Sequence, residues 1–172
     1  MKTVVLDPVP VEVERLIARR QRLGQDRFDE VWEGTYHMAP APRGRHGYLD
    51  GELAAMLRPR AEAAGLVETG QVNIGQPDDY RVPDRAYHRD FDPEAVYYPT
   101  AAVVVEIVSP GDETYQKLPF YAAHRVDEVL VVDPVGRSVR VLALAGEAYE
   151  DADRSSALGA GVEELQAGVR WP

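Results

Sequence analysis

Residues 101–108 constrain the fold more than any other segment, because they read Ala-Ala-Val-Val-Val-Glu-Ile-Val. An apolar, β-branched run of this length is typical of a β-strand that is covered on both faces. A turn at Ser109-Pro110-Gly111, a helical stretch to about His124 and a second apolar strand at Val129 to Val132 follow it. A strand, a helical crossover and another strand predict two parallel neighbours at the centre of a sheet.

Weaker patterns indicate what surrounds this centre. The expected elements are an outer amphipathic helix at 9–23, a hairpin at 28–38, a core helix at 46–64 that Pro59 kinks or shortens, strands at 66–74 and 80–82, a surface loop at 85–99 with one helical turn at 93–96, and an antiparallel strand at 139–144. Together they predict an α/β fold of the mixed α+β kind, with a central mixed β-sheet flanked by helices.

Length and composition limit the organisation of the chain. With 172 residues and 45% hydrophobic content, one domain over residues 1–172 is expected, and residues 1–24 form an N-terminal helical extension. The absence of cysteine excludes disulfides, thiolate zinc sites and cysteine nucleophiles, and it fits a reducing, cytoplasmic location. The N-terminal stretch contains no apolar block for a signal core or membrane span, so no membrane partner is expected.

The net charge of −10 argues against broad, non-specific binding to phosphates, which needs a basic surface. Net charge does not describe a single cleft, however, and the arginines cluster locally. The two clusters are Arg15, Arg19, Arg20 and Arg22, and then Arg43, Arg45, Arg58 and Arg60. A local basic track for nucleic acid therefore stays open.

Glu106 is the one ionisable residue inside the apolar run. An uncompensated carboxylate in such a strand costs several kcal/mol or becomes protonated. It could pair with an arginine or reach water at the strand end, which would be a structural role. It could instead be compensated by a metal ion or a lysine, which would be a functional role.

Asp84 follows Pro83 at the end of an expected strand and lies 22 positions before Glu106. If the intervening loop returns the chain beside it, two adjacent strands aim both carboxylates into one cleft. Hard oxygen ligands of this kind suit Mg²⁺ or Mn²⁺, which commonly takes only one or two protein carboxylates. Alone, Asp84 would read as an ordinary strand-end aspartate. A zinc site is not expected, because no paired ligand spacing links His37, His88 and His124.

Several short motifs in this order resemble the Uma-two family of predicted endonucleases. They are Glu30-Val31-Trp32-Glu33-Gly34, Met38-Ala39-Pro40-Ala41-Pro42 with His46, Pro83-Asp84, Val103-Val104-Val105-Glu106-Ile107-Val108-Ser109-Pro110, Lys117-Leu118-Pro119-Phe120-Tyr121-Ala122, Val126-Asp127-Glu128-Val129 and Val131-Val132-Asp133-Pro134. The resemblance runs from about residue 28 to 144. It implies a restriction-endonuclease-like core of the PD-(D/E)XK superfamily and an Asp, acidic, Lys site that hydrolyses DNA.

The sequence departs from the superfamily pattern two residues after Glu106, where Val108 stands in place of lysine. The family resemblance places the lysine at Lys117 instead, where it would position or activate water and offset the carboxylate charge. Without the motif, Lys117 would read as a solvated surface lysine. Pro119 suits only the first turn of a helix, so the regular helix is expected either to begin near Leu118 or to be kinked there. In the first case Lys117 caps the start of the helix, and Glu113, Lys117 and Tyr121 do not share one clean helical face.

Four further residues are weaker candidates for the site. His46, at the start of the expected core helix, could act as a proton carrier or metal neighbour, although a lone histidine is usually structural. Tyr121 could hydrogen-bond the site or simply belong to the core. Glu30 and Glu33 belong to the family-like opening segment.

The sequence thus predicts a Mg²⁺- or Mn²⁺-dependent endonuclease, with Asp84 and Glu106 on the metal and Lys117 and His46 assisting catalysis. A catalytically silent fold that acts as a binding module is the alternative, which the acidic charge and the missing strand lysine favour. A hydrolase of a small phosphorylated or carboxylated substrate is a third reading. A homodimer is expected, with the strand at 139–144 as an exposed edge for pairing.

Overall fold

The computed structural model describes residues 2–4, 9–109, 111 and 113–172, so Pro110 of the expected turn lies outside the described residues. Its helices are α1 (Val11–Arg22), α2 (Gly44–Ala63), the 3₁₀ turn η1 (Thr114–Lys117), α3 (Leu118–Ala123) and α4 (Val162–Gly168). None of the helices in the described part of the chain is both long and apolar enough to cross a membrane.

Within the described residues, the strands form two mixed six-stranded sheets and one small pair. The central sheet has the order β12 (Ala148–Ala152), β11 (Ser138–Ala145), β10 (Glu128–Asp133), β9 (Val103–Ile107), β7 (Arg85–His88) and β4 (Val67–Thr69). The second sheet has the order β1 (Lys2–Val4), β3 (Thr35–Met38), β2 (Glu30–Trp32), β6 (Asp79–Arg81), β5 (Asn73–Gln76) and β8 (Tyr97–Tyr98). The pair consists of β13 (Arg154–Ser155) and β14 (Ala160–Gly161).

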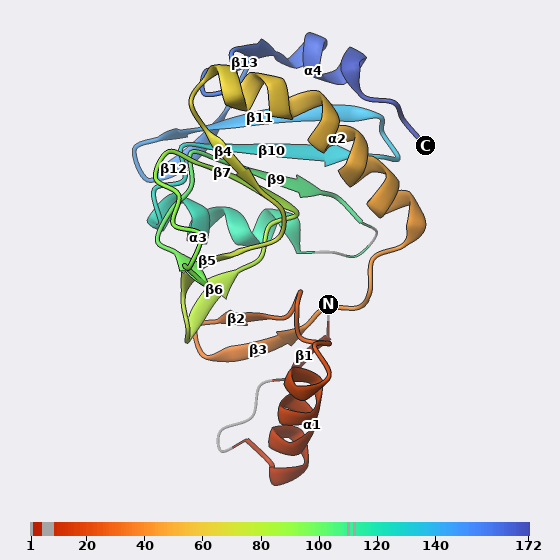
Figure 1. Ribbon diagram of the computed structural model, residues 1–172, viewed down its shortest axis with the longest axis vertical. Helices are drawn as coiled ribbons and strands as arrows, with labels where there is room; N and C mark the ends of the chain where they lie inside the picture. The colour runs from red at the N-terminus through yellow and green to blue at the C-terminus, as the bar shows by residue number, and fades with distance from the viewer. Residues whose placement is uncertain (1, 5–8, 110, 112) are drawn as a thin grey trace.

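The predicted centre is confirmed. β9 and β10 pair in parallel with Glu106 opposite Val131, and β11 pairs antiparallel to β10. All five residues of β9 are buried, as expected for a strand covered on both faces. Helices α2 and α4 cover one face of the central sheet and α3 covers the other (Figure 1). The expected mixed sheet flanked by helices is therefore present.

The two faces of β9 explain where Glu106 points. Val103, Val105 and Ile107 pack with the core under α2 and α4, whereas Val104 packs with the cluster around α3. Because side chains alternate along a strand, Glu106 lies on the same face as Val104. Its carboxylate is thus directed toward η1 and α3.

Helix α2 forms the cover of the opposite face. It begins at Gly44, two residues before the expected start, and Pro59 lies inside it. The spacing of its buried residues, Leu49, Leu53, Leu57 and Ala61, is the i, i+4 pattern of a core-facing stripe. This packing fixes the first turn of α2, which carries His46, beside the end of β9.

The prediction of a surface loop at 85–99 is wrong, because this segment contains strands β7 and β8. Arg85 looked like a surface residue, but it pairs with Asp50 and Glu68. His88 is buried and contacts Thr69 through its Nε2 atom at 3.1 Å. Only a hydrogen-bonded turn, Ala95 N–H to Asp92 O, stands where a helical turn was expected. This polar, tyrosine-rich segment thus forms strands because its side chains find partners elsewhere in the fold.

Two other expectations need correction. The strand expected at 66–74 is broken into β4 and β5, which belong to different sheets. The strand at 139–144 is not an exposed edge, because β12 pairs along β11 from Val141–Ala152 to Ala145–Ala148.

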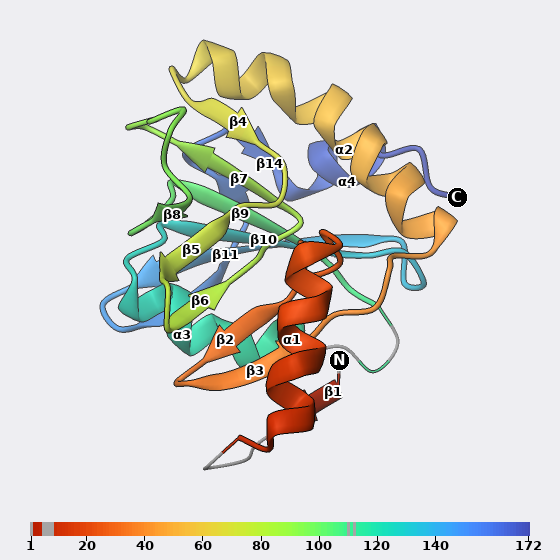
Figure 2. The ribbon, with the colours of Figure 1, turned by 60° about the horizontal axis from the view of Figure 1, so that its bottom comes forward.

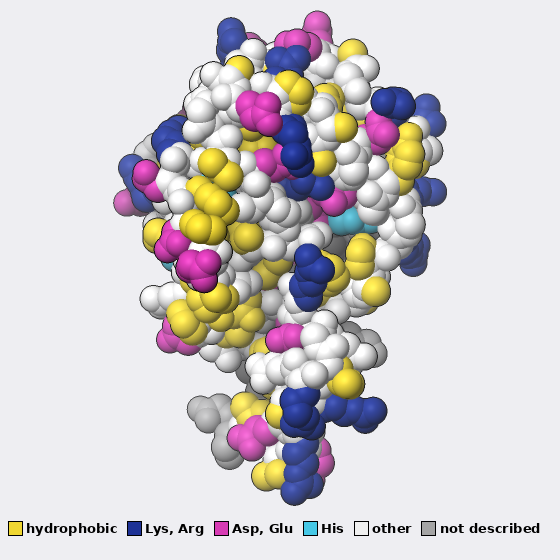
Figure 3. All heavy atoms as spheres, in the orientation of Figure 1, with side chains coloured by type: hydrophobic (Ala, Val, Ile, Leu, Met, Phe, Trp, Pro, Cys, Tyr) yellow, Lys and Arg dark blue, Asp and Glu magenta, His cyan; other side chains and the backbone are white. Residues whose placement is uncertain are grey.

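The N-terminal segment contains strand β1, which pairs with β3, and then helix α1. The hairpin of β2 and β3 turns at Glu33 and Gly34, whose positive φ angles of 49° and 81° fit a tight two-residue connection. Helix α1, all of whose residues are described, buries none of them and extends beyond the hairpin (Figures 1 and 2). Lys and Arg side chains gather along it (Figure 3).

Candidate active site

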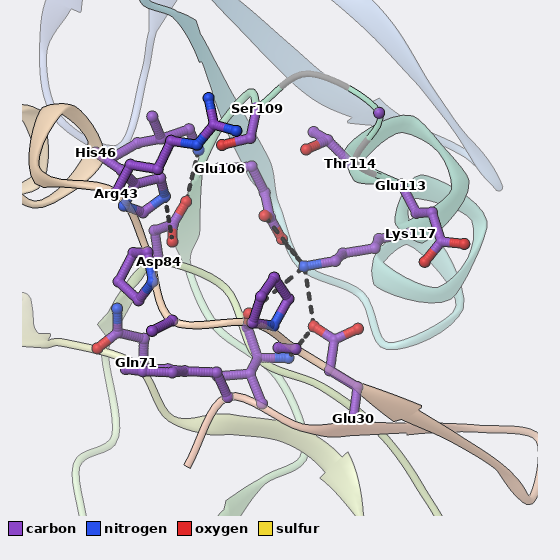
Figure 4. A pocket seen from close by; sticks show the side chains of 18 residues that line it. Glu30, Arg43, His46, Gln71, Asp84, Glu106, Ser109, Glu113, Thr114 and Lys117 are labelled. Carbon is purple, nitrogen blue, oxygen red and sulfur yellow. Dashed lines mark hydrogen bonds and ion pairs between the residues drawn. The ribbon is translucent and has the colours of Figure 1, made fainter. Parts of the chain in front are cut away.

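A cavity of about 380 Å³ lies beside the end of β9. Its lining includes Glu30, His46, Asp84, Glu106 and Lys117, so five of the seven residues predicted from the sequence line the same cavity. In the close-up view, His46 and Asp84 lie on one side of the cavity and Lys117 and Glu30 on the other, with Glu106 between them (Figure 4). The fold thus brings together residues from β2, α2, β9, η1 and the loop before β7.

Glu106 is 3% exposed and both of its carboxylate oxygens are engaged. The Nζ atom of Lys117 donates to Oε1 at 3.0 Å and to Oε2 at 3.2 Å, and the Tyr121 hydroxyl donates to Oε1 at 2.5 Å. Burial raises the pKa of Glu106 to about 7; Lys117 opposes this shift, while the nearby carboxylates of Asp84 and Glu30 add to it. The compensating group is therefore a lysine rather than an arginine or bulk water.

Lys117 is buried and lies between two carboxylates. Its Nζ atom is 2.9 Å from Glu30 Oε1, in addition to its contacts with Glu106, and it also donates to Val82 O at 3.5 Å. Burial lowers the pKa of Lys117, but Glu106 and Glu30 outweigh this effect and hold it above its ordinary value. Lys117 is thus an ammonium ion at neutral pH.

The local backbone explains why Lys117 reaches the strand. Residues 114–117 form a 3₁₀ turn, and the α-helix begins at Leu118 with Pro119 in its first turn, as predicted. Lys117 and Tyr121 both contact Glu106, whereas Glu113 lies beside His37, so the three residues do not share one face, as expected. Burial, followed by the charge of Glu106, raises the pKa of Tyr121 well above its ordinary value, so its hydroxyl is a donor.

Glu30 has a larger place in the site than the sequence indicated. It is 2% exposed and accepts three hydrogen bonds: its Oε1 accepts from Val82 N and from Lys117, and its Oε2 accepts from Trp32 Nε1. Because Glu30 and Trp32 are two residues apart in β2, both side chains lie on the same face of the strand. That spacing was the available signal in the sequence.

Asp84 lies immediately before β7, which pairs antiparallel with β9. Its Oδ2 accepts the backbone N–H of Ile107 at 2.7 Å, and its Oδ1 is 3.1 Å from His46 Nε2. The hydrogen bond with Asp84 raises the pKa of His46, and burial opposes this effect. The adjacency of Asp84 and Glu106 was thus expected, but the strand that follows Asp84, rather than the one before it, provides it.

Glu33 does not join this group. It lies exposed in the turn of the β2–β3 hairpin, where its backbone N–H donates to Asp79, and it does not line the cavity. Two charged residues that sequence reasoning did not place in the site do line it. They are Arg43, at the end of the proline-rich segment, and Glu113, which precedes η1. The Oε2 of Glu113 is 3.6 Å from His37 Nδ1.

The charges of the site are unbalanced. Lys117 forms ion pairs with Glu30 and Glu106, whereas Asp84 contacts His46. Three carboxylates and one lysine ammonium in one largely buried group favour an additional cation. The chemistry of the donors fits a hard divalent ion, because Asp84, just before β7, and Glu106, in the neighbouring strand β9, both offer carboxylate oxygens.

The number of protein ligands that the cavity offers distinguishes between Mg²⁺ or Mn²⁺ and Zn²⁺. Over residues 2–4, 9–109, 111 and 113–172, no cluster of three or more His, Cys, Asp or Glu side chains has the arrangement of a complete metal site. Mg²⁺ and Mn²⁺ need no such cluster, since they use one or two carboxylates and complete their shell with water and substrate oxygens. Zn²⁺ would require more protein ligands than this cavity supplies.

The fold of this chain is similar to that of a solved structure. The structure of a protein described as a putative nuclease belonging to DUF820, from Anabaena variabilis ATCC 29413, matches with a TM-score of 0.66 and 17% identity. The match covers 81% of this chain and 90% of that chain, so the two share a fold.

The sequence of this chain also matches the model of a protein family. Residues 13–168 match the model of the Uma2 family, described as "Putative restriction endonuclease". The chain belongs to the Uma2 family, as its motifs predicted. None of the curated proteins matches it.

Proposed function

We propose that the chain is a Mg²⁺- or Mn²⁺-dependent endonuclease that hydrolyses phosphodiester bonds of DNA at the cavity beside β9. The observation that carries this proposal is the convergence of Asp84, Glu106 and Lys117, from three separate elements, on one cavity. Membership of the Uma2 family supports the same reaction class. The excess of carboxylates over cations supports the need for a metal ion.

Each residue has a role that follows from its surroundings. Asp84 and Glu106 would hold the ion, and His46 and the Ile107 N–H orient Asp84. When bound, such an ion stabilises charge on the phosphoryl group and lowers the pKa of the attacking water. Lys117 is charged at neutral pH, so it donates hydrogen bonds to the water or to a phosphate oxygen and does not act as a base.

Glu30 and Tyr121 position these groups. Glu30 receives Lys117 at 2.9 Å and is itself fixed by the Val82 N–H and by Trp32. Tyr121 fixes Oε1 of Glu106 at 2.5 Å. A rigid set of supporting hydrogen bonds is what a hydrolytic site needs, because small displacements of the reacting groups cost rate.

DNA contacts outside the cavity would come from α1. Arg15, Arg19 and Arg22 are exposed, and their spacing of four and three residues aligns them on one face of the helix. None of the three has an ion pair with a described carboxylate. By contrast, Arg20 pairs with Asp29 at 2.6 Å. Contacts of this kind bind phosphates without selecting a sequence.

The experiment is a nicking assay on supercoiled plasmid with Mg²⁺ or Mn²⁺. The parent and Glu33→Gln, whose side chain lies outside the cavity, are expected to nick the plasmid, and Glu106→Gln is expected not to. Nicking by Glu106→Gln at the parental rate would overturn the site. If no protein nicks but the metal raises the melting temperature of the parent and of Glu33→Gln and not that of Glu106→Gln, the site binds metal and serves a smaller phosphorylated substrate. If the metal has no effect at all, the fold is a silent binding module.

We also propose a cytoplasmic homodimer, as the sequence suggested. Since β12 covers β11, the edges of the central sheet are β12 and β4, so pairing through this sheet has to use one of these strands. Light scattering coupled to gel filtration measures the mass in solution, and a monomeric mass would overturn the dimer.

A further inference from the structure

Arg43 differs from the other charged residues of the cavity. Of the described residues that line the cavity, Arg43 and Lys117 carry a permanent positive charge. Lys117 already forms ion pairs with Glu30 and Glu106. Among the described residues, no carboxylate forms an ion pair with Arg43, and it is exposed at the side of the cavity where Asp84 and His46 lie (Figure 4). Its guanidinium is therefore available to a ligand.

The backbone holds Arg43 in a fixed place. It ends the segment Ala39-Pro40-Ala41-Pro42, in which both prolines restrict their own φ and keep the preceding residues extended. The start of this segment is anchored, because the Ala39 N–H donates to Asp29 Oδ1 at 2.8 Å. Its end is anchored as well, because the carbonyl of Arg43 accepts the N–H groups of His46 and Gly47 in the first turn of α2. Hydrogen bonds thus hold the backbone at both ends of this segment.

The charge of the ligand follows from these facts. A guanidinium presents parallel N–H donors that match two oxygens of a carboxylate or phosphate group. No carboxylate of the described chain takes this place on Arg43, although Asp84, Glu106 and Glu113 line the same cavity. An anionic substrate that enters a cavity with this many carboxylates needs a cation at the entrance.

We infer that Arg43 binds the non-bridging oxygens of the phosphodiester that enters the cavity, and so places the phosphorus atom beside Asp84 and Glu106. This inference rests on the proposed phosphodiesterase function and adds to it the residue that holds the substrate. It makes Arg43 a substrate-binding residue, distinct from the arginines of α1, which would contact phosphates outside the cavity.

The test uses bis(4-nitrophenyl) phosphate, which carries one phosphodiester and isolates the cavity from the rest of a DNA surface. Hydrolysis with Mn²⁺ is followed by nitrophenolate release, and binding is measured separately by calorimetry with Ca²⁺ in place of Mn²⁺. The variants are Arg43→Ala, Arg43→Lys and Arg45→Ala. Arg45 is a matched control, because it is exposed two residues further on and does not line the cavity.

Arg43→Ala is expected to raise both the KM and the Kd roughly 10- to 100-fold, the loss typical of a hydrogen bond to a charged group, with kcat changed much less. Arg43→Lys should recover part of the loss, and Arg45→Ala should stay within about twofold of the parent. Equal effects of Arg43→Ala and Arg45→Ala would overturn the inference, because the two charges would then act only through the general field.

The remaining outcomes separate this inference from the proposed function. If the parent hydrolyses neither this diester nor plasmid DNA but binds the diester in an Arg43-dependent way, the proposed function fails and the phosphate site stands. If the parent nicks plasmid DNA but Arg43→Ala leaves diester binding and hydrolysis unchanged, the function stands and the assignment of Arg43 fails. A parent that binds no diester also overturns the assignment.

Discussion

Glu106→Gln should make the metal-free protein more stable, and the gain should grow with pH. The carboxylate is 3% exposed, and its pKa is about 7 in the folded chain, against an ordinary value of 4.5. The folded chain therefore keeps a proton on Glu106 between pH 4.5 and 7 that the unfolded chain releases. Stability from this group is fully present below pH 4.5 and is lost as the pH rises through 7.

The magnitude follows from the pKa difference. One pKa unit corresponds to about 1.4 kcal/mol, so the complete loss is about 3 kcal/mol, and about 2 kcal/mol of it falls between pH 5.5 and 8.5. Glutamine has nearly the shape of the protonated acid and cannot ionise, while Lys117 keeps its contact with Glu30 at 2.9 Å. The free energy of unfolding of Glu106→Gln should therefore exceed that of the parent by about 2 kcal/mol more at pH 8.5 than at pH 5.5.

Urea denaturation in EDTA at the two pH values measures this difference, and Glu33→Gln, an exposed glutamate, serves as the control. A variant that is less stable than the parent at pH 8.5, or a difference that does not change with pH, would refute the reasoning. Either result would mean that Lys117 and Tyr121 stabilise the ionised carboxylate fully. A stabilised but inactive variant would also show that loss of nicking is not caused by unfolding.

Three further perturbations test the surroundings of the site. Lys117→Met leaves two buried carboxylates without their cation and should lower the free energy of unfolding by about 3–5 kcal/mol at pH 8, measured with urea; a change below about 1 kcal/mol would contradict the buried ion pairs. Tyr121→Phe removes one hydrogen bond to a buried charge and should cost about 1–3 kcal/mol in the same assay, whereas a neutral effect would show that the bond is not made. Replacing Arg15, Arg19 and Arg22 with alanine should reduce the salt dependence of duplex DNA binding, with a slope lower by about 2 to 3 in fluorescence anisotropy, and an unchanged slope would remove α1 from the interface. The single domain expected over residues 1–172 should unfold in one transition that circular dichroism and tryptophan fluorescence report at the same midpoint, and two separate midpoints would contradict it.

The centre of the fold was predictable because its signals are local. The apolar run at 101–108 and the apolar residues from Val129 to Val132 predict two buried parallel strands without any information about the rest of the chain. Strand β7 was missed because its burial depends on residues that are distant in the sequence. Arg85 can be buried only because Asp50 and Glu68 form ion pairs with it. The second sheet was missed as a unit because its short strands are joined by pairings far apart in the sequence, such as Val31 with Tyr80.

The candidate site shows the same division. Glu106 could be recognised because a carboxylate in an apolar strand needs a partner, and Asp84 could be placed beside it through the motif. The importance of Glu30 was underestimated, because a strand of three residues does not reveal which face is buried and the spacing of Glu30 and Trp32 was the one available signal. The shared contact of Lys117 and Tyr121 with Glu106 depends on the change from a 3₁₀ turn to an α-helix at Leu118, which the sequence located without giving its orientation.

The central claim is that Asp84 and Glu106 together hold one divalent cation, and calorimetric titration of Mn²⁺ tests it most directly. We expect one ion per chain for the parent and for Glu33→Gln, and no measurable binding at the same concentrations for Asp84→Asn and Glu106→Gln. Binding of one Mn²⁺ with unchanged affinity in both site variants would place the ion elsewhere and contradict the account.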